Sequence, residues 1–134
     1  MLLVFACADI DSSKSSLPPI QPNPNGDSEL ALLMRDMFDD GMRMKGQIEN
    51  GDKLEVVGKF DKIHTAQATE PEKAASEKYT RYSYVYLDIL EQLKVSSEED
   101  TRILFQGLVE SCMNCHRAMC PGPMVRIKKL YLKK

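Results

Sequence analysis

The first regular pattern along the chain is a set of apolar residues at helical spacing. Between Asp27 and Asn50, apolar residues recur at steps of three and four, the spacing of one face of an α-helix. Asp27 or Ser28 can cap its start, and Asn50-Gly51-Asp52 provides its end. We therefore predict a long amphipathic helix over residues 27–50. Its stripe comprises Leu30, Leu33, Met34, Met37, Phe38, Gly41, Met44 and Ile48.

A shorter and weaker pattern comes next. Its apolar positions are Leu54, Val57, Phe60 and Ile63. These positions fit helical spacing, although Gly58 and the β-branched pair Val56-Val57 disfavour a helix. We expect a second helix from Leu54 to about Thr65.

The third predicted helix follows a loop over residues 65–73. Thr69 and Glu72 resemble a capping box, and Pro71 suits a first helical turn. The helix is expected to run to about Lys94 with one apolar stripe. The stripe comprises Tyr79, Tyr82, Tyr86, Ile89, Leu90 and Leu93.

The fourth predicted helix has the clearest start. Ser96 and Glu99 form a capping box, and Pro121-Gly122-Pro123 ends the pattern. Its inner stripe comprises Leu104, Leu108, Ser111, Cys112, Cys115 and Met119. A basic tail over residues 124–134 has mixed periodicity and can pack back on the helices. Four helical patterns with short connections predict an all-α protein, an antiparallel four-helix bundle over residues 27–134.

Residues 1–26 have a different composition. The run Met1–Cys7 resembles the end of a bacterial lipoprotein signal, in which the cysteine becomes lipid-modified. The basic residues that begin such a signal are missing, so either the true N-terminus lies upstream of Met1 or the apolar tip arose by chance. Residues 8–26 are rich in Ser, Pro, Asn and Asp, a linker composition. We expect a truncated signal remnant and flexible linker, with a lipid anchor at Cys7.

Composition narrows the class of protein. Apolar residues make up 43% and charged residues 28% of the 134 residues, an ordinary balance for one domain. The net charge of −2 suggests no nucleic-acid partner. No apolar run is long enough to span a membrane. The eight methionines stand out, because methionine serves both as an adaptable core residue and as a thioether iron ligand.

The most specific signal is Cys112-Met113-Asn114-Cys115-His116. This C-x-x-C-H pattern is that of covalent c-type haem attachment. Each thiol adds across one haem vinyl group to form a thioether, and the adjacent histidine binds the iron. We predict one covalent haem c, with Cys112 and Cys115 as thioethers and His116 as proximal ligand.

Two other interpretations of the pattern are weaker. A structural zinc site usually needs a second pair of ligands, and only Cys7, Cys120 and His64 are left to supply one. A thioredoxin-type C-x-x-C is expected near a βαβ pattern, and no strand alternation precedes Cys112. Cys120 follows His116 by one helical turn, and its role stays open between packing, an intermolecular disulfide and contact with the haem edge.

A four-helix bundle with C-x-x-C-H on its last helix resembles the cytochrome c′ family and its low-spin relatives, over roughly residues 27–120. The resemblance implies that a residue of the first helix faces the iron opposite His116. Counting back from Asn50-Gly51 along the family pattern reaches Met34, which we expect as the distal ligand. Met37, His64 and an open site remain alternatives.

The resemblance also implies a function. A six-coordinate His/Met haem suits an electron-transfer cytochrome with a redox partner protein. The alternative is a cytochrome c′-like protein with an open or labile sixth position that binds gases such as NO or CO. We expect no enzyme, because no Ser/His/Asp arrangement and no phosphate loop is present. Haem attachment in bacteria implies a periplasmic protein, membrane-anchored if Cys7 is lipidated. A homodimer through the first two helices is a further expectation from the resemblance.

Overall fold

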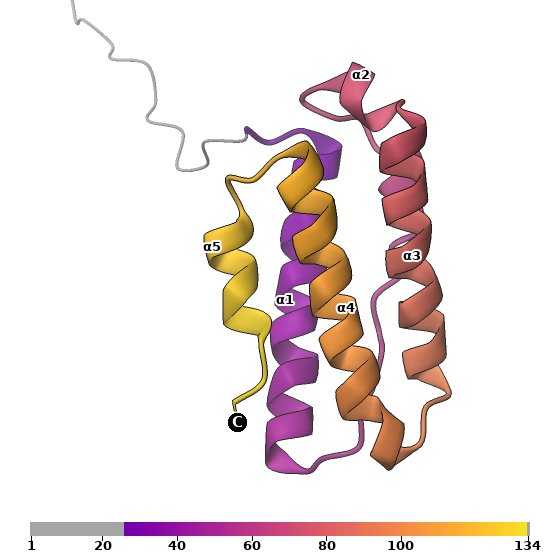
Figure 1. The fold of residues 1–134 in the computed structure, drawn as a ribbon, viewed down its shortest axis with the longest axis vertical. Helices are drawn as coiled ribbons and strands as arrows, with labels where there is room; N and C mark the ends of the chain where they lie inside the picture. Colours follow the sequence, from indigo (N-terminus) through magenta and orange to yellow (C-terminus); the bar gives the residue numbers. More distant parts are fainter. Residues whose placement is uncertain (1–25, 134) are drawn as a thin grey trace, which may run out of the picture.

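A computed structural model of the chain describes residues 26–133, and these are mostly helical, so the predicted all-α class is confirmed. Three long helices run along the molecule, with α1 and α3 antiparallel to α4 (Figure 1). The elements are α1 Glu29–Asn50, η1 Asp61–His64, α2 Pro71–Ala74, α3 Glu77–Lys94, α4 Glu98–Met119, α5 Met124–Ile127 and η2 Lys128–Leu130.

The long helices end close to the predicted places. The Ser28 hydroxyl accepts the backbone N–H of Ala31, and Gly51 ends α1 in the left-handed conformation. The predicted cap of α4 is wrong by one residue. Ser97 caps that helix, because its hydroxyl accepts the N–H of Asp100, whereas the Ser96 hydroxyl donates to the carbonyl of Leu93.

The start of the third predicted helix is also later than expected. Pro71 begins only the short α2, which ends at Ala74. The long α3 begins at Glu77, where the Ser76 hydroxyl accepts the backbone N–H of Tyr79 at 3.2 Å. The predicted cap at Thr69 is therefore wrong, since the N-cap of α2 is Glu70 and no side-chain hydrogen bond caps that helix.

The predicted second helix is absent. Residues 52–60 form an extended segment, called the strap below, and only Asp61–His64 are helical, as a 3-10 turn. Extended chain rises about 3.3 Å per residue, so the strap covers about 30 Å, whereas a helix of the same length would cover about 14 Å. The strap can therefore return the chain along the whole of α1, whose 22 residues span about 33 Å. A four-helix bundle is accordingly not confirmed.

The strap is attached to its neighbours from both sides. Arg43 of α1 donates to the carbonyl of Glu55, and the N–H of Glu55 donates to the Gln47 side chain. Just beyond the far end of the strap, the Tyr79 hydroxyl of α3 donates to the carbonyl of Ile63 in η1 at 2.7 Å. The strap thus occupies the place of the missing helix between α1 and α3.

The core lies between the three long helices and the strap. α3 and α4 pack along each other, and the buried rings of Phe60 and Tyr86 lie 6.4 Å apart between their centroids. The buried apolar residues are Met37, Met44, Ile48, Phe60, Ile63, Tyr79, Tyr86, Leu90, Leu93, Phe105, Leu108, Val109, Met113, Ile127, Leu130 and Leu132. One strap residue and the end of the tail therefore belong to the same core as the helices.

The C-terminal tail covers the side of α1 and α4 that faces away from α3 (Figure 1). Leu130 is buried directly over Gly41 of α1, where a Cβ would lie 3.1 Å from the leucine side chain. The Tyr131 hydroxyl donates to Glu110 of α4 at 2.7 Å. The expectation that the tail packs back on the helices is thus confirmed.

Lys45 holds this tail in place, and its removal should be measurable. Its ammonium donates to the carbonyls of Lys129 and Tyr131, at 2.7 Å each, and its side chain is only 14% exposed. Hydrogen bonds to charged groups are the stronger ones. We expect Lys45→Met to lower the free energy of unfolding by about 2 kcal/mol in urea titrations followed by circular dichroism.

The matched control is Lys53→Met, at an exposed lysine just after α1. Exposed substitutions usually change stability by about 0.5 kcal/mol or less. Equal losses in both variants would show that the tail is not held by Lys45.

None of the helices within residues 26–133 is long and apolar enough to cross a membrane.

Candidate functional site

The last two turns of α4 carry the C-x-x-C-H motif. Cys112, Cys115 and His116 stand at positions i, i+3 and i+4, so their side chains share one face of the helix. His116 is buried, whereas the two cysteines are partly buried. The predicted inward orientation of the motif therefore holds best for the histidine.

The His116 ring is anchored by the backbone just beyond the helix. Its Nδ1 lies 3.1 Å from the carbonyl oxygen of Cys120 and 3.4 Å from the Cys120 sulfur. Pro121 holds the residue before it in an extended conformation, and Cys120 has φ −157° and ψ 88°. A carbonyl only accepts hydrogen bonds, so this contact favours the tautomer with a proton on Nδ1 and a lone pair on Nε2. Burial also lowers the pKa of His116, which favours the neutral ring.

Tyrosines of α3 lie opposite the two thiols. Burial raises the pKa of Tyr79 to about 12, with further increases from Cys115 and Cys120 nearby. Burial also raises the pKa of Tyr86, and Cys112 and Asp40 act on it in the same direction. The thiols themselves are protonated at neutral pH, because burial raises the pKa of Cys112 to about 12 and of Cys115 to about 11. The motif thus sits in an apolar and aromatic environment between α3 and α4.

This environment bears on the alternative interpretations of the motif. A reactive dithiol needs a thiol pKa lowered by positive neighbours, and both pKa values are raised here. Within the part of the chain that the structure describes, no group of three or more His, Cys, Asp or Glu residues is placed to hold a metal ion. The donor set that is present, two thiols and a buried imidazole on one helix face, fits covalent attachment of a haem.

Met34 lies at the same end of the molecule as the motif. α1 begins where α4 ends (Figure 1), with Met34 five residues after Glu29 and His116 three residues before Met119. At 1.5 Å per residue, the two lie about 8 Å and about 5 Å from that end, at nearly the same level. Met34 is partly buried against the core, whereas Met37 is buried within it. Met34 therefore has the freer side chain of the two candidates.

His64 and Cys120 are both exposed. His64 ends η1, with its Nδ1 3.2 Å from the Ser83 hydroxyl and its ring 4.4 Å from that of Tyr84. The third thiol, Cys120, is the C-cap of α4 and is free, as are the two motif cysteines. Cys7, the predicted lipid attachment site, lies outside the described residues.

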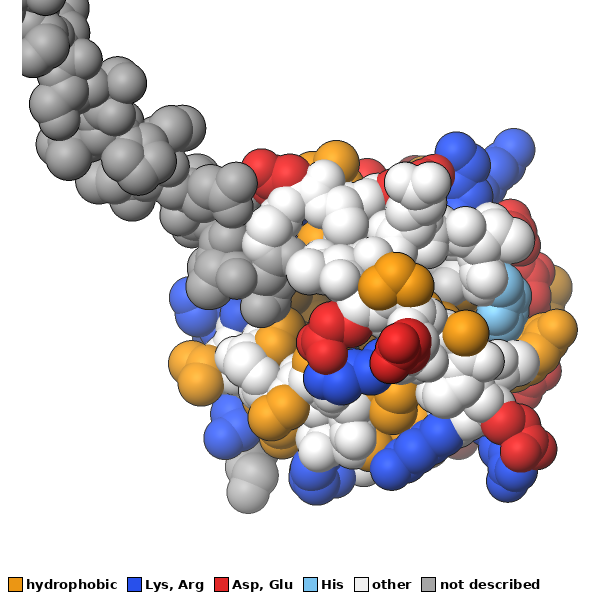
Figure 2. Space-filling model, turned by 90° about the horizontal axis from the view of Figure 1, so that it is seen from above, with side chains coloured by type: hydrophobic (Ala, Val, Ile, Leu, Met, Phe, Trp, Pro, Cys, Tyr) orange, Lys and Arg blue, Asp and Glu red, His pale blue; other side chains and the backbone are white. Residues whose placement is uncertain are grey.

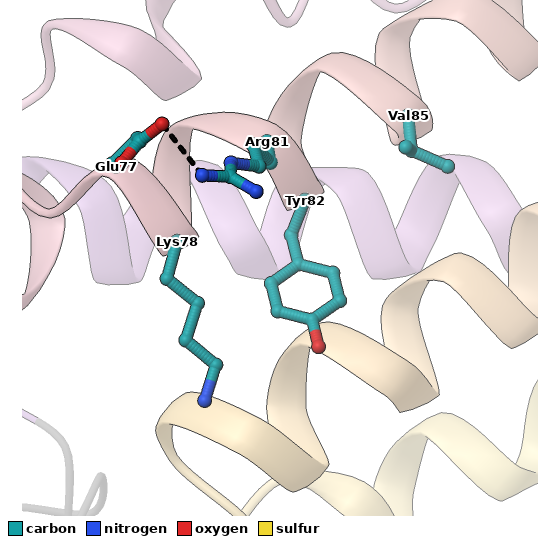
Figure 3. Close-up of a pocket in the computed structure, with 5 residues that line it drawn as sticks. All are labelled: Glu77, Lys78, Arg81, Tyr82 and Val85. Carbon is teal, nitrogen blue, oxygen red and sulfur yellow. Dashed lines mark hydrogen bonds and ion pairs between the residues drawn. The ribbon is translucent and has the colours of Figure 1, made fainter.

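A surface hollow of about 420 Å³ lies on α3 near the motif. It is lined by Glu77, Lys78, Arg81, Tyr82 and Val85, and Lys78 and Tyr82 point toward α4 (Figure 3). Arg81 and Glu77 form an ion pair across its rim at 2.6 Å. The hollow is an open groove, and none of the motif residues lines it.

The structure also identifies neighbours that the motif itself did not point to. The carbonyl of Cys120 is one, and Pro121, placed in the sequence as a helix stop, is the signal that could have suggested it. Asp40, a buried acid on the core face of α1, is a further residue that the sequence did not single out. Its spacing of three from Met37 and four from Met44 places it on the predicted stripe, but stripes are recognised by apolar residues alone.

Comparison with protein-family models, with curated protein sequences and with solved structures finds no significant match to this chain.

Proposed function

We propose that this protein is a c-type cytochrome that carries one covalently attached haem and transfers electrons. Cys112 and Cys115 would form the thioethers, His116 would be the proximal iron ligand and Met34 the distal one. The proposal keeps the resemblance to the low-spin relatives of cytochrome c′, although the second helical pass is extended in this chain. A bound haem would supply a one-electron couple, and the protein would supply orientation and electrostatics.

The observation that carries the proposal is the contact between His116 Nδ1 and the carbonyl of Cys120 at 3.1 Å. Histidines that bind metals usually donate their second ring N–H to a carbonyl or carboxylate, which fixes the tautomer and the ring orientation. A buried histidine prepared in this way, one position after a C-x-x-C pair, has the form of an iron ligand. In the tautomer that this contact favours, Nε2 carries the lone pair that an iron ion would bind.

The remaining parts of the proposal concern location and partners. Attachment of haem c in bacteria places the protein in the periplasm, and a lipid at Cys7 would hold it at a membrane surface without a spanning helix. The partner would be another redox protein. At the end where α1 begins and α4 ends, acidic and basic side chains are interspersed with apolar ones (Figure 2), a surface suited to mixed polar and apolar contacts.

The direct test is the absorption spectrum of the full chain produced in a bacterial host that matures c-type cytochromes. We expect a red protein whose haem stays with the polypeptide in acidified organic solvent. The ferric form should show low-spin bands and a methionine-to-iron charge-transfer band. A colourless protein, or haem that extracts freely, would contradict the proposal. Zinc analysis of the same sample would then test the metal-binding interpretation.

A further inference from the structure

Asp40 is a buried acid with an unusual environment. It lies on the core face of α1, and its side chain is only 7% exposed. Arg43 binds its Oδ1 through two guanidinium nitrogens, at 3.0 Å and 2.6 Å. The second oxygen, Oδ2, is buried and has no hydrogen-bond partner in the described residues. Burying a carboxylate oxygen in this way is costly, so its position calls for an explanation.

The ion pair between Asp40 and Arg43 has a defined orientation, with one partner nearer to solvent than the other. The Arg43 side chain is 34% exposed and also bonds Gln47 and the carbonyl of Glu55, so its charge lies toward solvent. The carboxylate points inward, within electrostatic reach of the buried Tyr86 hydroxyl. Because water screens the outer charge more than the inner one, the field inside the helices is that of a negative charge.

This field reaches the side of the molecule that carries the motif. Asp40 lies six residues after Met34 on α1, about 9 Å along the helix axis, and both Asp40 and Cys112 act electrostatically on the buried Tyr86 of α3. The buried carboxylate is therefore on the same helix as the proposed distal ligand, at a distance over which a charge in the protein interior still acts.

We infer that the Asp40–Arg43 pair is an oriented dipole that lowers the reduction potential of a haem held on α4. The inference rests on the proposed function. Reduction adds an electron to the haem, and a buried negative charge nearby disfavours that step. The unpartnered oxygen is then a functional feature, because a hydrogen bond to it would weaken the field.

The test is a spectroelectrochemical titration of the holoprotein at pH 7 and low ionic strength. Asp40→Asn removes the inner charge at nearly constant shape. We expect the equilibrium constant for reduction to rise roughly tenfold, an increase in potential of about 59 mV for one electron. Arg43→Gln leaves the carboxylate unpaired, so we expect the potential to fall. An electrostatic role predicts shifts of opposite sign in the two variants. General damage to the fold would instead shift the potential of both variants in the same direction.

The matched control is Asp39→Asn, the neighbouring acid, whose side chain is 69% exposed. We expect Asp39→Asn to change the reduction potential by only a small fraction of the Asp40→Asn shift, because water screens the Asp39 charge. The inference is wrong if haem is attached and Asp40→Asn shifts the potential no more than Asp39→Asn, or if Arg43→Gln shifts it in the same direction as Asp40→Asn. If the wild-type chain takes up no haem, the proposed function fails instead, and the inference with it.

Discussion

Protein carrying Cys112→Ala together with Cys115→Ala should be recovered without covalent haem. A thioether forms when a thiol adds across a vinyl group, and this variant has neither thiol of the motif. We expect all of its haem to pass into acidified organic solvent, while the wild type keeps its haem on the polypeptide. Mass spectrometry of the denatured chains should show the haem mass on the wild type alone.

Cys120→Ala is the matched control for this experiment. Cys120 also lies near His116, but it is outside the motif and exposed at the end of α4. We expect this variant to keep its haem and its spectrum. Loss of covalent haem in Cys120→Ala, or retention in the double variant, would overturn the assignment of the two thioethers.

Met34→Ala should convert the ferric protein from low spin to high spin. Without the thioether, the iron loses its sixth ligand, so the methionine-to-iron charge-transfer band should disappear. Carbon monoxide should then bind the ferrous form rapidly, because no ligand has to leave first. Absorption spectra of both oxidation states, with and without carbon monoxide, would measure all of these changes.

Met37→Ala separates ligation from packing. Met37 is one turn further along α1 and is buried in the core. Truncating a buried methionine costs roughly 2–5 kcal/mol of stability. We therefore expect Met37→Ala to unfold at lower urea concentration but to remain low spin. If Met37→Ala becomes high spin and Met34→Ala does not, the distal ligand is Met37.

The wild-type spectrum itself decides between the two classes of cytochrome. Ferric wild type that is already high spin and binds carbon monoxide rapidly would exclude Met34 as a ligand. That outcome would favour the gas-binding alternative and would leave the thioether assignments intact.

The long helices were predictable because their signals are local. Ser28 and Gly51 cap α1 through hydrogen bonds within a few residues of the cap, and these follow from the residue types at those positions. Ser96 and Ser97 show the limit of this reasoning. Both can cap a helix, and the choice of Ser97 depends on Ser96 being used by Leu93 and Thr101.

The strap shows where a local pattern was ambiguous. Leu54, Val57 and Phe60 fit a helical period, but Leu54, Val56 and Phe60 fit a period of two equally well. The structure follows the second pattern, with Leu54, Val56 and Phe60 turned inward and Val57 63% exposed. Gly58 favours this arrangement, because a Cβ there would lie 2.1 Å from the Phe60 ring.

The candidate site was likewise predictable from the sequence only in part. The residues proposed to hold the haem follow from the spacing of the motif on one helix, since the chemistry of attachment depends on adjacent positions. Their surroundings come from segments far apart in the chain, such as Tyr79 and Tyr86 of α3. No pattern within one segment reveals such neighbours.

The amino-acid order thus specified the long helices, the caps of α1 and the identity of the motif, because these depend on hydrogen bonds and side-chain periods within a few residues. The extended second pass, the clamped tail and the inward carboxylate of Asp40 depend instead on packing between distant segments. Hydrophobic burial is non-directional and satisfies several local patterns equally, so only the assembled core selects among them.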